Sequence, residues 1–490
     1  SSFSRGLMAL AGVVLVTIIG LGYWYYSGGK QIESIAVMPF VNESGDKDVE
    51  YLSDGMTETL ISSLSQLRDL DVKPRSAVFR YKGKENDPQT AGNELKVEAV
   101  LTGRITQRGD DISLYAELID VAKNKTMWSK SYKRKQSALV ALQSDIARDV
   151  SSRITTVLSG ADEENVTNLY TKNSEAYQLY LKGNFYTSKL TKEGFEKGNE
   201  FFEQAITQDP NYALAYNGIA FNQLAAMDWF SAPKIAGPKA KAAVEKAVEL
   251  NEELAETQLF RGMVAHWVDW DWKTAEAAYK KAIDLDPDAF RPNGYYSWFL
   301  ANMGRNDEAV AVATRCQQAD PISPEANWYL GAALLAAGRS EDSIARLQTA
   351  IDLEPSYFYA HAFQGRAYLQ AGRRKEALEA FKRAHKLESN NFENWANLAY
   401  AQGVNGNEEE ARKIIAYLKE KSEVSYVSPY YLAIAHAGLG DTERVFSFLE
   451  LAIKDKSDSL ILYLTADPQM EAIRTDPRYK VILKRINLPE

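Results

Sequence analysis

Gly331-Ala-Ala-Leu-Leu-Ala-Ala-Gly338 is followed, 34 residues later, by Gly365-Arg-Ala-Tyr-Leu-Gln-Ala-Gly372. The second glycine of each stretch belongs to a longer series with the same step: Gly304, Gly338, Gly372, Gly406 and Gly440. Glycine readily adopts the positive φ that the C-cap of a helix needs. The spacing therefore predicts a series of equal helical units, in each of which the first helix ends at one of these glycines.

Small and large apolar residues follow the same 34-residue step, and prolines close three of the units. Two antiparallel helices approach closely only where side chains are small, and proline stops a helix because it has no N–H to donate. This pattern is the tetratricopeptide (TPR) signature, and it predicts a right-handed α-solenoid of about eight repeats over 174–456, with 457–490 as a C-terminal cap. The small columns are Ala275, Ala309, Ser343, Ala377, Ala411, Val445 and Ala282, Cys316, Ala350, Ala384, Leu418, Ala452; the large column is Tyr279, Ala313, Leu347, Phe381, Ile415, Leu449; the prolines are Pro287, Pro321 and Pro355.

Charge and cysteine content exclude two classes of protein. The 490 residues carry a net charge of -9, which argues against a nucleic-acid partner because phosphate binding needs a basic face. The single cysteine excludes an internal disulfide framework. Because Cys316 lies in a small-residue column, we expect a buried thiol that serves as a small apolar side chain.

Residues 7–26 form an uncharged stretch rich in Leu, Val and Ile. As a helix it would span about 30 Å, the thickness of the hydrocarbon core of a bilayer. A cleavable signal peptide is the alternative, but aromatic residues stand where a small-residue cleavage site would be expected. We therefore predict a single transmembrane helix. Arg5 and Lys30 flank it evenly, so charge does not set its orientation, and a chain that begins without Met leaves a fragment or a processed product open.

Residues 31–160 lack the 34-residue period, and their pattern of apolar residues predicts a separate small α/β domain. The expected strands cover 32–40, 72–81, 99–107, 112–120 and 126–133, and the expected helices cover 49–67, 89–95 and 138–158. Four stretches carry a family resemblance: Ser34-Ile-Ala-Val-Met-Pro-Phe40, Tyr51-Leu-Ser-Asp-Gly-Met-Thr-Glu-Thr-Leu-Ile61, Val97-Glu-Ala-Val-Leu-Thr-Gly-Arg104, and Leu118-Ile-Asp120 with Trp128-Ser129. In order and spacing they resemble the TolB-amino-terminal-like domain of bacterial proteins.

The TolB-like resemblance implies a cellular setting. In bacterial proteins of this architecture the module precedes TPR arrays and commonly follows a membrane helix whose cytoplasmic side bears a serine/threonine kinase, a nucleotide cyclase or a DNA-binding domain. The sequence motifs of such domains do not occur in these 490 residues. The expected location is therefore the bacterial inner membrane, crossed once, with the bulk of the chain in the periplasm.

Motifs for catalysis or cofactor binding are absent from the sequence. The four histidines His266, His361, His385 and His436 lie in different repeats, and no H-E-x-x-H, Walker A, G-x-G-x-x-G or G-x-S-x-G pattern occurs. We therefore expect no enzyme activity, no cofactor and no metal site.

Three polar or aromatic clusters have competing interpretations. Ser53 or Asp54 is expected to cap a helix rather than form a catalytic carboxylate pair with Glu58. A basic run over 130–135 is expected to lie on a solvated edge strand, with contact to anionic lipid or an acidic partner as the alternative. The tryptophans of 267–272 are expected to fill the gap left by a one-residue insertion, with ligand binding as the alternative.

The leading functional interpretation is a membrane-anchored scaffold that binds an apolar or mixed peptide segment of a protein partner on the concave face of the solenoid. Aromatic and arginine side chains are enriched at binding hot spots. Two alternatives stay open: the regulatory half of a receptor kinase, cyclase or transcription regulator, and a structural subunit of a homo-oligomer or larger membrane complex. The predicted protein-binding residues are Phe221, His266, Trp267, Arg291, Trp298, Glu325, Trp328, Arg366, Tyr400 and Tyr430.

Overall fold

The computed structural model describes residues 32–489 except 68, 85–86, 156–158 and 288. The chain divides into two compact units, Ser1–Leu169 and Tyr170–Glu490. The predicted membrane segment, residues 7–26, lies outside the described residues. Among the residues that are described, no helix is both long enough and apolar enough to cross a bilayer.

The first unit is built on one sheet with the strand order β3-β1-β4-β5-β6, in which β2 also pairs with β4. Strand β1 is parallel to β3 and β4, whereas β4, β5 and β6 form an antiparallel meander. The strands predicted at 32–40, 99–107, 112–120 and 126–133 are confirmed as β1, β4, β5 and β6. Their bounds are β1 (Ser34–Val37), β2 (Val41–Asn42), β3 (Asp71–Val72), β4 (Ala99–Arg108), β5 (Asp111–Asp120) and β6 (Lys125–Lys135).

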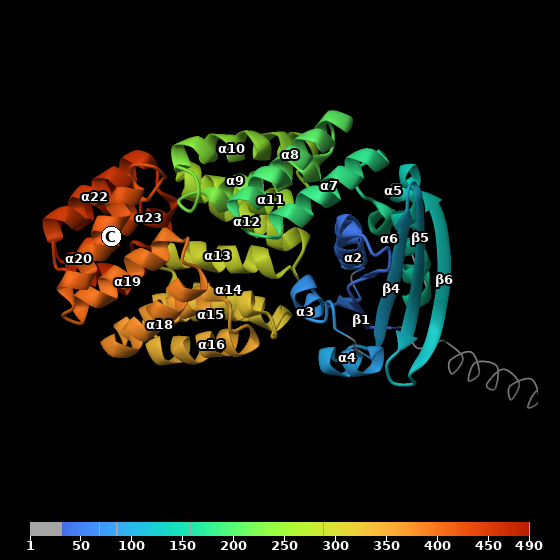
Figure 1. The fold of residues 1–490 in the computed structure, drawn as a ribbon, viewed down its shortest axis with the longest axis horizontal. Helices are drawn as coiled ribbons and strands as arrows, with labels where there is room; N and C mark the ends of the chain where they lie inside the picture. The colour runs from blue at the N-terminus through green and yellow to red at the C-terminus, as the bar shows by residue number, and fades with distance from the viewer. Residues whose placement is uncertain (1–31, 68, 85–86, 156–158, 288, 490) are drawn as a thin grey trace, which may run out of the picture. The chain divides into compact units, whose positions relative to one another are not determined.

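The helices of the first unit flank the sheet in Figure 1. They are α2 (Glu50–Leu64), α3 (Arg75–Phe79), α4 (Pro88–Leu95), α5 (Leu139–Ile154) and α6 (Gly160–Thr167), with short 3₁₀ turns η1 (Lys47–Val49) and η2 (Gln136–Ala138). Helices α2 and α5 are joined by Gln143, whose side-chain amide donates a 3.2 Å hydrogen bond to the Met56 carbonyl. Fully buried Met56 and Leu60 place the apolar stripe of α2 in the core.

The predicted strand at 72–81 is wrong. Strand β3 ends at Val72, and the chain turns at Pro74 into helix α3. Proline has no N–H for the strand ladder but suits the start of a helix, so Pro74 ends the strand that the apolar residues after it had suggested.

The second unit is an array of helix pairs that runs from green to red in Figure 1. In the described part of 174–455 there are eight pairs, and we call the first helix of each pair helix A and the second helix B. The pairs are α7 (Ser174–Thr187) and α8 (Lys192–Gln208), α9 (Ala213–Ala226) and α10 (Pro233–Leu250), α11 (Ala255–Met263) and α12 (Trp272–Leu285), α13 (Phe290–Asn302) and α14 (Asn306–Ala319), α15 (Pro324–Ala336) and α16 (Ser340–Leu353), α17 (Phe358–Gln370) and α18 (Arg374–Leu387), α19 (Phe392–Val404) and α20 (Glu408–Lys421), and α21 (Pro429–Ala437) and α22 (Thr442–Asp455).

The glycines at the 34-residue step have the predicted backbone conformation, with φ between 69° and 85° at all five positions. Other glycines of the repeat allow close packing: a Cβ at Gly331 would lie 2.6 Å from Cγ of Leu347, and one at Gly365 would lie 2.6 Å from the Phe381 ring. Side chains of the small column, such as Ala350 and Ala384, are fully buried. The 34-residue period of small residues therefore arises from direct contact between helix A and helix B.

The insertion in the third repeat is absorbed by a π-helical turn, η3 (Val264–Asp269), which continues α11. A π-turn accommodates one additional residue without breaking the helix. Trp267 is buried, and the Trp270 indole donates a 3.2 Å hydrogen bond to the Trp267 carbonyl. The tryptophans of this turn therefore pack in the repeat core and against its edge, as the gap-filling interpretation predicts.

Residues 457–488, which we call the tail, follow the last repeat. The tail holds α23 (Asp458–Tyr463), the 3₁₀ turn η4 (Pro468–Ile473) and α24 (Pro477–Arg485). Helix α24 pairs with the last B helix, α22, through Arg478 with Glu443 and Arg485 with Glu450. Helix α23 contacts α13, and η4 contacts α17 and α21. The tail thus covers the last repeat and also lies against A helices further back in the array.

Replacing Ala384 with Trp should destabilise the array, because the fully buried alanine leaves no room for a larger side chain between the two helices. We expect a loss of about 1–3 kcal/mol or more in unfolding free energy, measured by chemical denaturation. Glu379→Trp on the same helix is the matched control, since the Glu379 side chain is 71% exposed. Equal unfolding curves for the two variants would contradict the assigned register.

Candidate functional site on the inner face of the repeat array

The ten predicted binding residues lie on A helices α9, α13, α15, α17, α19 and α21 and on the η3 turn. Their exposure differs widely. His266, Trp267, Trp328, Arg366 and Tyr430 are buried. Phe221, Trp298, Glu325 and Tyr400 are half-buried, and Arg291 is exposed.

His266 belongs to the packed core of the third repeat. Its Nδ1 lies 3.2 Å from the Tyr279 hydroxyl, and its Nε2 lies 3.2 Å from the amide nitrogen of Asn302. Burial lowers the pKa of His266 to about 3, so the ring is neutral at physiological pH. Its hydrogen bonds position the ring between neighbouring helices.

Two tryptophans of the predicted site form one aromatic cluster with the tail. The rings of Trp298 and Trp328 meet edge to face at 5.2 Å, and the Trp298 ring lies 5.7 Å from that of Tyr463 in α23. The Trp298 indole donates a 3.2 Å hydrogen bond to the Leu462 carbonyl. The inner face thus engages the main chain of the tail as well as its side chains.

Arg366 is the centre of a buried ion network between helices α17 and α19 and the tail. Its side chain is 1% exposed, with Nη2 2.7 Å from Oε1 of Glu393 and Nε 3.4 Å from Oδ2 of Asp467. The guanidinium also stacks 4.7 Å from the centre of the Tyr463 ring. Burial raises the pKa of Asp467, an effect that the nearby Arg366 charge opposes.

A second polar cluster joins the second repeat to the end of the array. Asp228, in the loop between α9 and α10, is 1% exposed. Its carboxylate accepts hydrogen bonds from the Ser457 hydroxyl at 2.5 Å, the Ser459 amide at 2.9 Å and the Tyr426 hydroxyl at 3.1 Å. Lys234 and Asp455 add an exposed ion pair at 3.3 Å. We call the contacts of Asp228 with these three residues the Asp228 clasp.

Asp458 lies beside this clasp, and the shift of its pKa predicts that the stability of the fold depends on pH. Burial and the Asp228 carboxylate raise the pKa of Asp458 well above its ordinary value of 3.8. A carboxyl whose pKa is higher in the folded state stabilises the fold fully below the ordinary pKa, and that stabilisation is lost as the pH rises through the folded-state pKa. Asp458→Asn should therefore unfold at higher denaturant concentration than the wild type at pH 8, and the difference should shrink towards pH 4.

Glu443→Gln is the control for this measurement, because its side chain is 81% exposed. It should show no such pH-dependent gain. A difference between Asp458→Asn and the wild type that stays constant from pH 4 to pH 8 would contradict the shared burial of Asp228 and Asp458.

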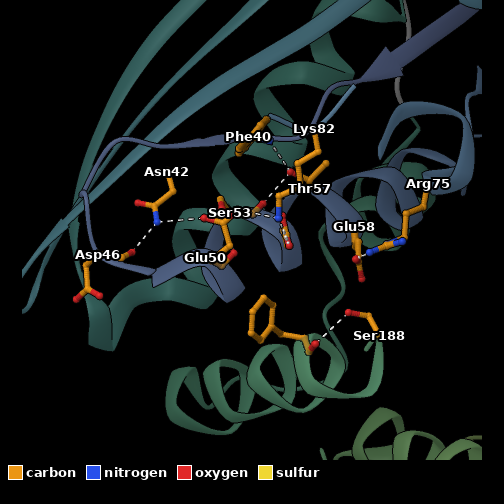
Figure 2. A network of polar contacts seen from close by, with 12 residues as sticks. Phe40, Asn42, Asp46, Glu50, Ser53, Thr57, Glu58, Arg75, Lys82 and Ser188 are labelled. Carbon is orange, nitrogen blue, oxygen red and sulfur yellow. Dashed lines mark hydrogen bonds and ion pairs between the residues drawn. The ribbon is translucent and has the colours of Figure 1, made fainter. Parts of the chain in front are cut away.

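The first unit holds its own polar cluster on helix α2, drawn in Figure 2. The Lys82 ammonium lies 2.7 Å from Oε1 of Glu50 and 2.6 Å from Oδ2 of Asp54, and Arg75 pairs with Glu58. Burial raises the pKa of Asp54, and the Lys82 charge opposes this. These pairs tie the chain around α3 to α2.

The predicted capping role of Ser53 or Asp54 is wrong. Helix α2 begins at Glu50 and its N-cap, Val49, makes no side-chain capping bond, so both residues lie inside the helix. The Ser53 hydroxyl instead donates a 3.0 Å hydrogen bond to the Glu50 carbonyl. The preceding 3₁₀ turn η1 starts the helix earlier than the capping pattern suggests.

The basic run lies on edge strand β6, as predicted, and the structure pairs several of its charges. Lys130 contacts Asp149 at 2.5 Å, and Arg134 contacts Asp145 at 2.9 Å, so α5 neutralises part of the run. Cys316 is also buried as predicted, and burial raises the pKa of its thiol. Within the described residues, no group of three His, Cys, Asp or Glu side chains is arranged to hold a metal ion.

Comparisons with protein families agree with two parts of this architecture. Residues 300–358, 330–391 and 364–422 match a model of the tetratricopeptide repeat, so the C-terminal part of the chain contains TPR repeats. Residues 30–149 match a model described as the second domain of HilA/YgeH-like transcriptional regulators, so the N-terminal unit holds a HilA-like domain. The TolB-like resemblance is not confirmed by this match.

Individual proteins are similar to only part of this chain, at low sequence identity. "Putative adenylate cyclase 3" of Rhizobium meliloti (strain 1021) is 29% identical over 187 residues, which are 38% of this chain and 32% of that protein. The match thus spans about a third of the length of the curated relative.

Solved structures with similar helices include the type IV pilus biogenesis factor PilW, at 19% identity and a TM-score of 0.36, covering 45% of this chain and 96% of that chain. Another is YrrB, described as a TPR protein with an unusual peptide-binding site, at 21% identity and a TM-score of 0.27, covering 38% and 92%. At these scores the likenesses add nothing to the repeat assignment.

Two residues of the tail belong to this site, although the repeat pattern does not point to them. Tyr463 and Asp467 complete the surroundings of Trp298 and Arg366, although they lie beyond the last repeat. The apolar run Leu460-Ile-Leu-Tyr463, directly after the array, was the available signal of a segment that needs a partner surface.

Proposed function

We propose that this chain is a non-catalytic scaffold that binds segments of protein partners on the inner face of its TPR array. The observation that carries the proposal is the tail, which the A helices already hold as a polypeptide segment. The indole of Trp298 on the A helix α13 donates a 3.2 Å hydrogen bond to the Leu462 carbonyl, and the indole of Trp272, at the start of the B helix α12, donates a 2.8 Å hydrogen bond to the Asn487 carbonyl. The array thus already holds one polypeptide segment, through bonds to main-chain carbonyls that do not depend on the side chains of that segment.

Part of the predicted site stays reachable by solvent beside the tail. Arg291 is exposed, with its Nε 3.9 Å from Oε1 of Glu325, and Phe221 and Tyr400 are half-buried. These side chains offer aromatic surface together with both signs of charge. We infer that a partner segment of mixed apolar and polar character binds beside the tail rather than in place of it.

Site-specific photo-crosslinking in the full chain tests this proposal. A benzoylphenylalanine placed at Arg291 should crosslink to a defined protein in cells of the source bacterium. The same probe at Glu409, whose side chain on helix α20 is 88% exposed, is the control and should give no specific product. The same products from both positions, or none from Arg291, would overturn binding at the inner face.

The membrane anchor and the location form part of the proposal. The uncharged stretch 7–26 supports a single crossing of the inner membrane. The flanking charges set no orientation, so the periplasmic side is proposed from the TolB-like resemblance of the sequence alone. A reporter that is active only in the periplasm, fused after residue 490, should be active. Activity of a reporter restricted to the cytoplasm would reverse this orientation.

A second candidate function is regulation of an enzyme domain encoded on the same chain. The observation that favours it is the similarity to a protein named as an adenylate cyclase, of which this chain matches 32%. In this reading the HilA-like domain and the TPR array control a catalytic domain and do no chemistry themselves. A cyclase or kinase domain encoded in frame upstream of Ser1 would support regulation, and the absence of any such domain would remove it.

A further inference from the structure

Three successive A helices carry a charged residue at their second position, on the side of the array that A helices line. These residues are Glu256 on α11, Arg291 on α13 and Glu325 on α15, and we call them the charged row. Nε of Arg291 lies 3.9 Å from Oε1 of Glu325. The charges of Glu325 and Glu256 both raise the pKa of Arg291, so both carboxylates act on the one guanidinium. The charged row therefore holds a net negative charge.

Within the described part of the chain, Glu256 shares its cation, because Arg291, which attracts it, lies beside Glu325. Glu256 is exposed to solvent, yet burial raises the pKa of its carboxyl, an effect that Arg291 and a hydrogen bond with Asn217 oppose. A side chain that reaches solvent and is still poorly hydrated lies in a concave part of the surface. A cation brought by a partner would stabilise this carboxylate.

Two tyrosine rings lie beside the charged row. The rings of Tyr295 and Tyr329 meet edge to face at 5.7 Å, and the Tyr329 hydroxyl donates a 3.5 Å hydrogen bond to Oε1 of Glu325. Burial raises the pKa of both tyrosines, and the charge of Glu325 adds to the rise, so both rings lie close to this carboxylate. Tyr295 is half-buried, so part of its ring can contact a ligand. Carboxylates and the faces of aromatic rings both attract positive charge.

The tail contacts helix α13 further along than the charged row. The Leu462 carbonyl accepts its hydrogen bond from Trp298, which follows Arg291 by about two turns of α13. The side chains of Arg291 and Glu325 are 53% and 29% exposed. The charged row is therefore available to a segment that binds beside the tail.

We propose that the charged row binds a cationic side chain, arginine or lysine, of the partner segment, and that this side chain lies against the Tyr295 ring. The proposal rests on the function proposed above and adds the chemistry of the residue that is recognised. An acidic residue in the same place could pair with Arg291, but Glu256 and Glu325 would repel it.

Three labelled peptides test the proposal with the full chain. They share the sequence Gly-Ala-Leu-X-Leu-Ala-Gly, in which X is arginine, glutamine or glutamate. We expect the arginine peptide to bind at least fivefold more tightly than the glutamine peptide and the glutamate peptide to bind most weakly, measured by fluorescence polarisation. The reason is that the arginine meets a net negative charge and an aromatic ring together.

Two variants should change the affinity in opposite directions. Glu256→Gln should weaken the arginine peptide to about the level of the glutamine peptide, whereas Arg291→Met should strengthen it, because the carboxylates lose the cation that they share. Glu409→Gln on helix α20, where the side chain is 88% exposed, is the matched control and should bind like the wild type. If Glu256→Gln fails to fold, Glu325→Gln replaces it with the same expected loss.

Two outcomes would overturn the proposal. Tightest binding of the glutamate peptide, lost in Arg291→Met, would show an anion site. Equal binding of all three peptides, unchanged in Glu256→Gln, would show that the carboxylates serve only the N-termini of their helices. Both outcomes leave the crosslinking expected at Arg291 intact. The lack of a crosslinked protein would instead overturn the function proposed above, even if the arginine peptide bound.

Discussion

Deletion of residues 456–490 is expected to leave a chain that no longer folds into the compact array. The tail contributes fully or almost fully buried apolar side chains, each of which adds roughly 1.5–3 kcal/mol on burial. Together they match or exceed the roughly 5–15 kcal/mol by which typical domains are stable. Circular dichroism should show a large drop in melting temperature, and a hydrophobic dye should bind the exposed A helices. These side chains are Leu460, Ile461, Leu464, Met470, Ile473, Ile482 and Ile486.

Two further samples make this result specific. Deletion of residues 489–490 alone, beyond the last buried side chain Leu488, should leave the melting temperature unchanged. A synthetic peptide of residues 456–490, added to the shortened chain during refolding, should restore helicity and suppress dye binding. A shortened chain that melts like the full one would show that the tail is dispensable for the fold.

Replacement of Arg366 by Met is expected to lower the unfolding free energy by about 3–5 kcal/mol, because it removes the positive charge from two buried carboxyl groups. The Glu393 and Asp467 side chains are 8% and 0% exposed, so water cannot replace the guanidinium. Urea denaturation at pH 7 gives the measurement. The loss should shrink as the pH falls towards 5, because carboxyl groups without a cation take up protons more readily in the folded state.

The triple variant Arg366→Met, Glu393→Gln, Asp467→Asn separates charge from packing. Neutral amides should recover much of the lost stability, since no uncompensated charge is left inside. A triple variant as unstable as Arg366→Met would show instead that the loss comes from the stacking of the guanidinium on Tyr463.

The repeats could be predicted from the sequence because their physical causes are local. Five of the eight A helices end beside a glycine with positive φ, and Gly331 meets Leu347 only 16 residues later in the chain. The same local reasoning failed at residues 72–81, where apolar residues outweighed Pro74. The expected helix at 49–67 is confirmed as α2, but the local pattern wrongly made Ser53 or Asp54 its cap, because α2 begins at Glu50 directly after the 3₁₀ turn η1.

The surroundings of the candidate site could be predicted only in part. The repeat pattern correctly predicted that Trp298, Trp328 and Arg366 lie on A helices, but it gave no indication of the residues that contact them. The partners Leu462 and Asp467 lie 164 and 101 residues further along the chain, outside the period. A repeat pattern describes neighbouring units, so it is silent on a segment that returns across several of them. Whether the ten residues bind a partner stays a prediction.

The Asp228 clasp changes how the array should come apart. In an open array each repeat contacts only its neighbours, so unfolding begins at the terminal repeats and spreads inward. The clasp bonds the second repeat to residues on either side of the last repeat, so the second to eighth repeats form a closed ring without a free end. Opening any one of these repeats would then strain the clasp. Amide exchange from α9 to α22 should consequently occur in one concerted event at a single protection level, with graded protection confined to the first helix pair, which lies outside the ring.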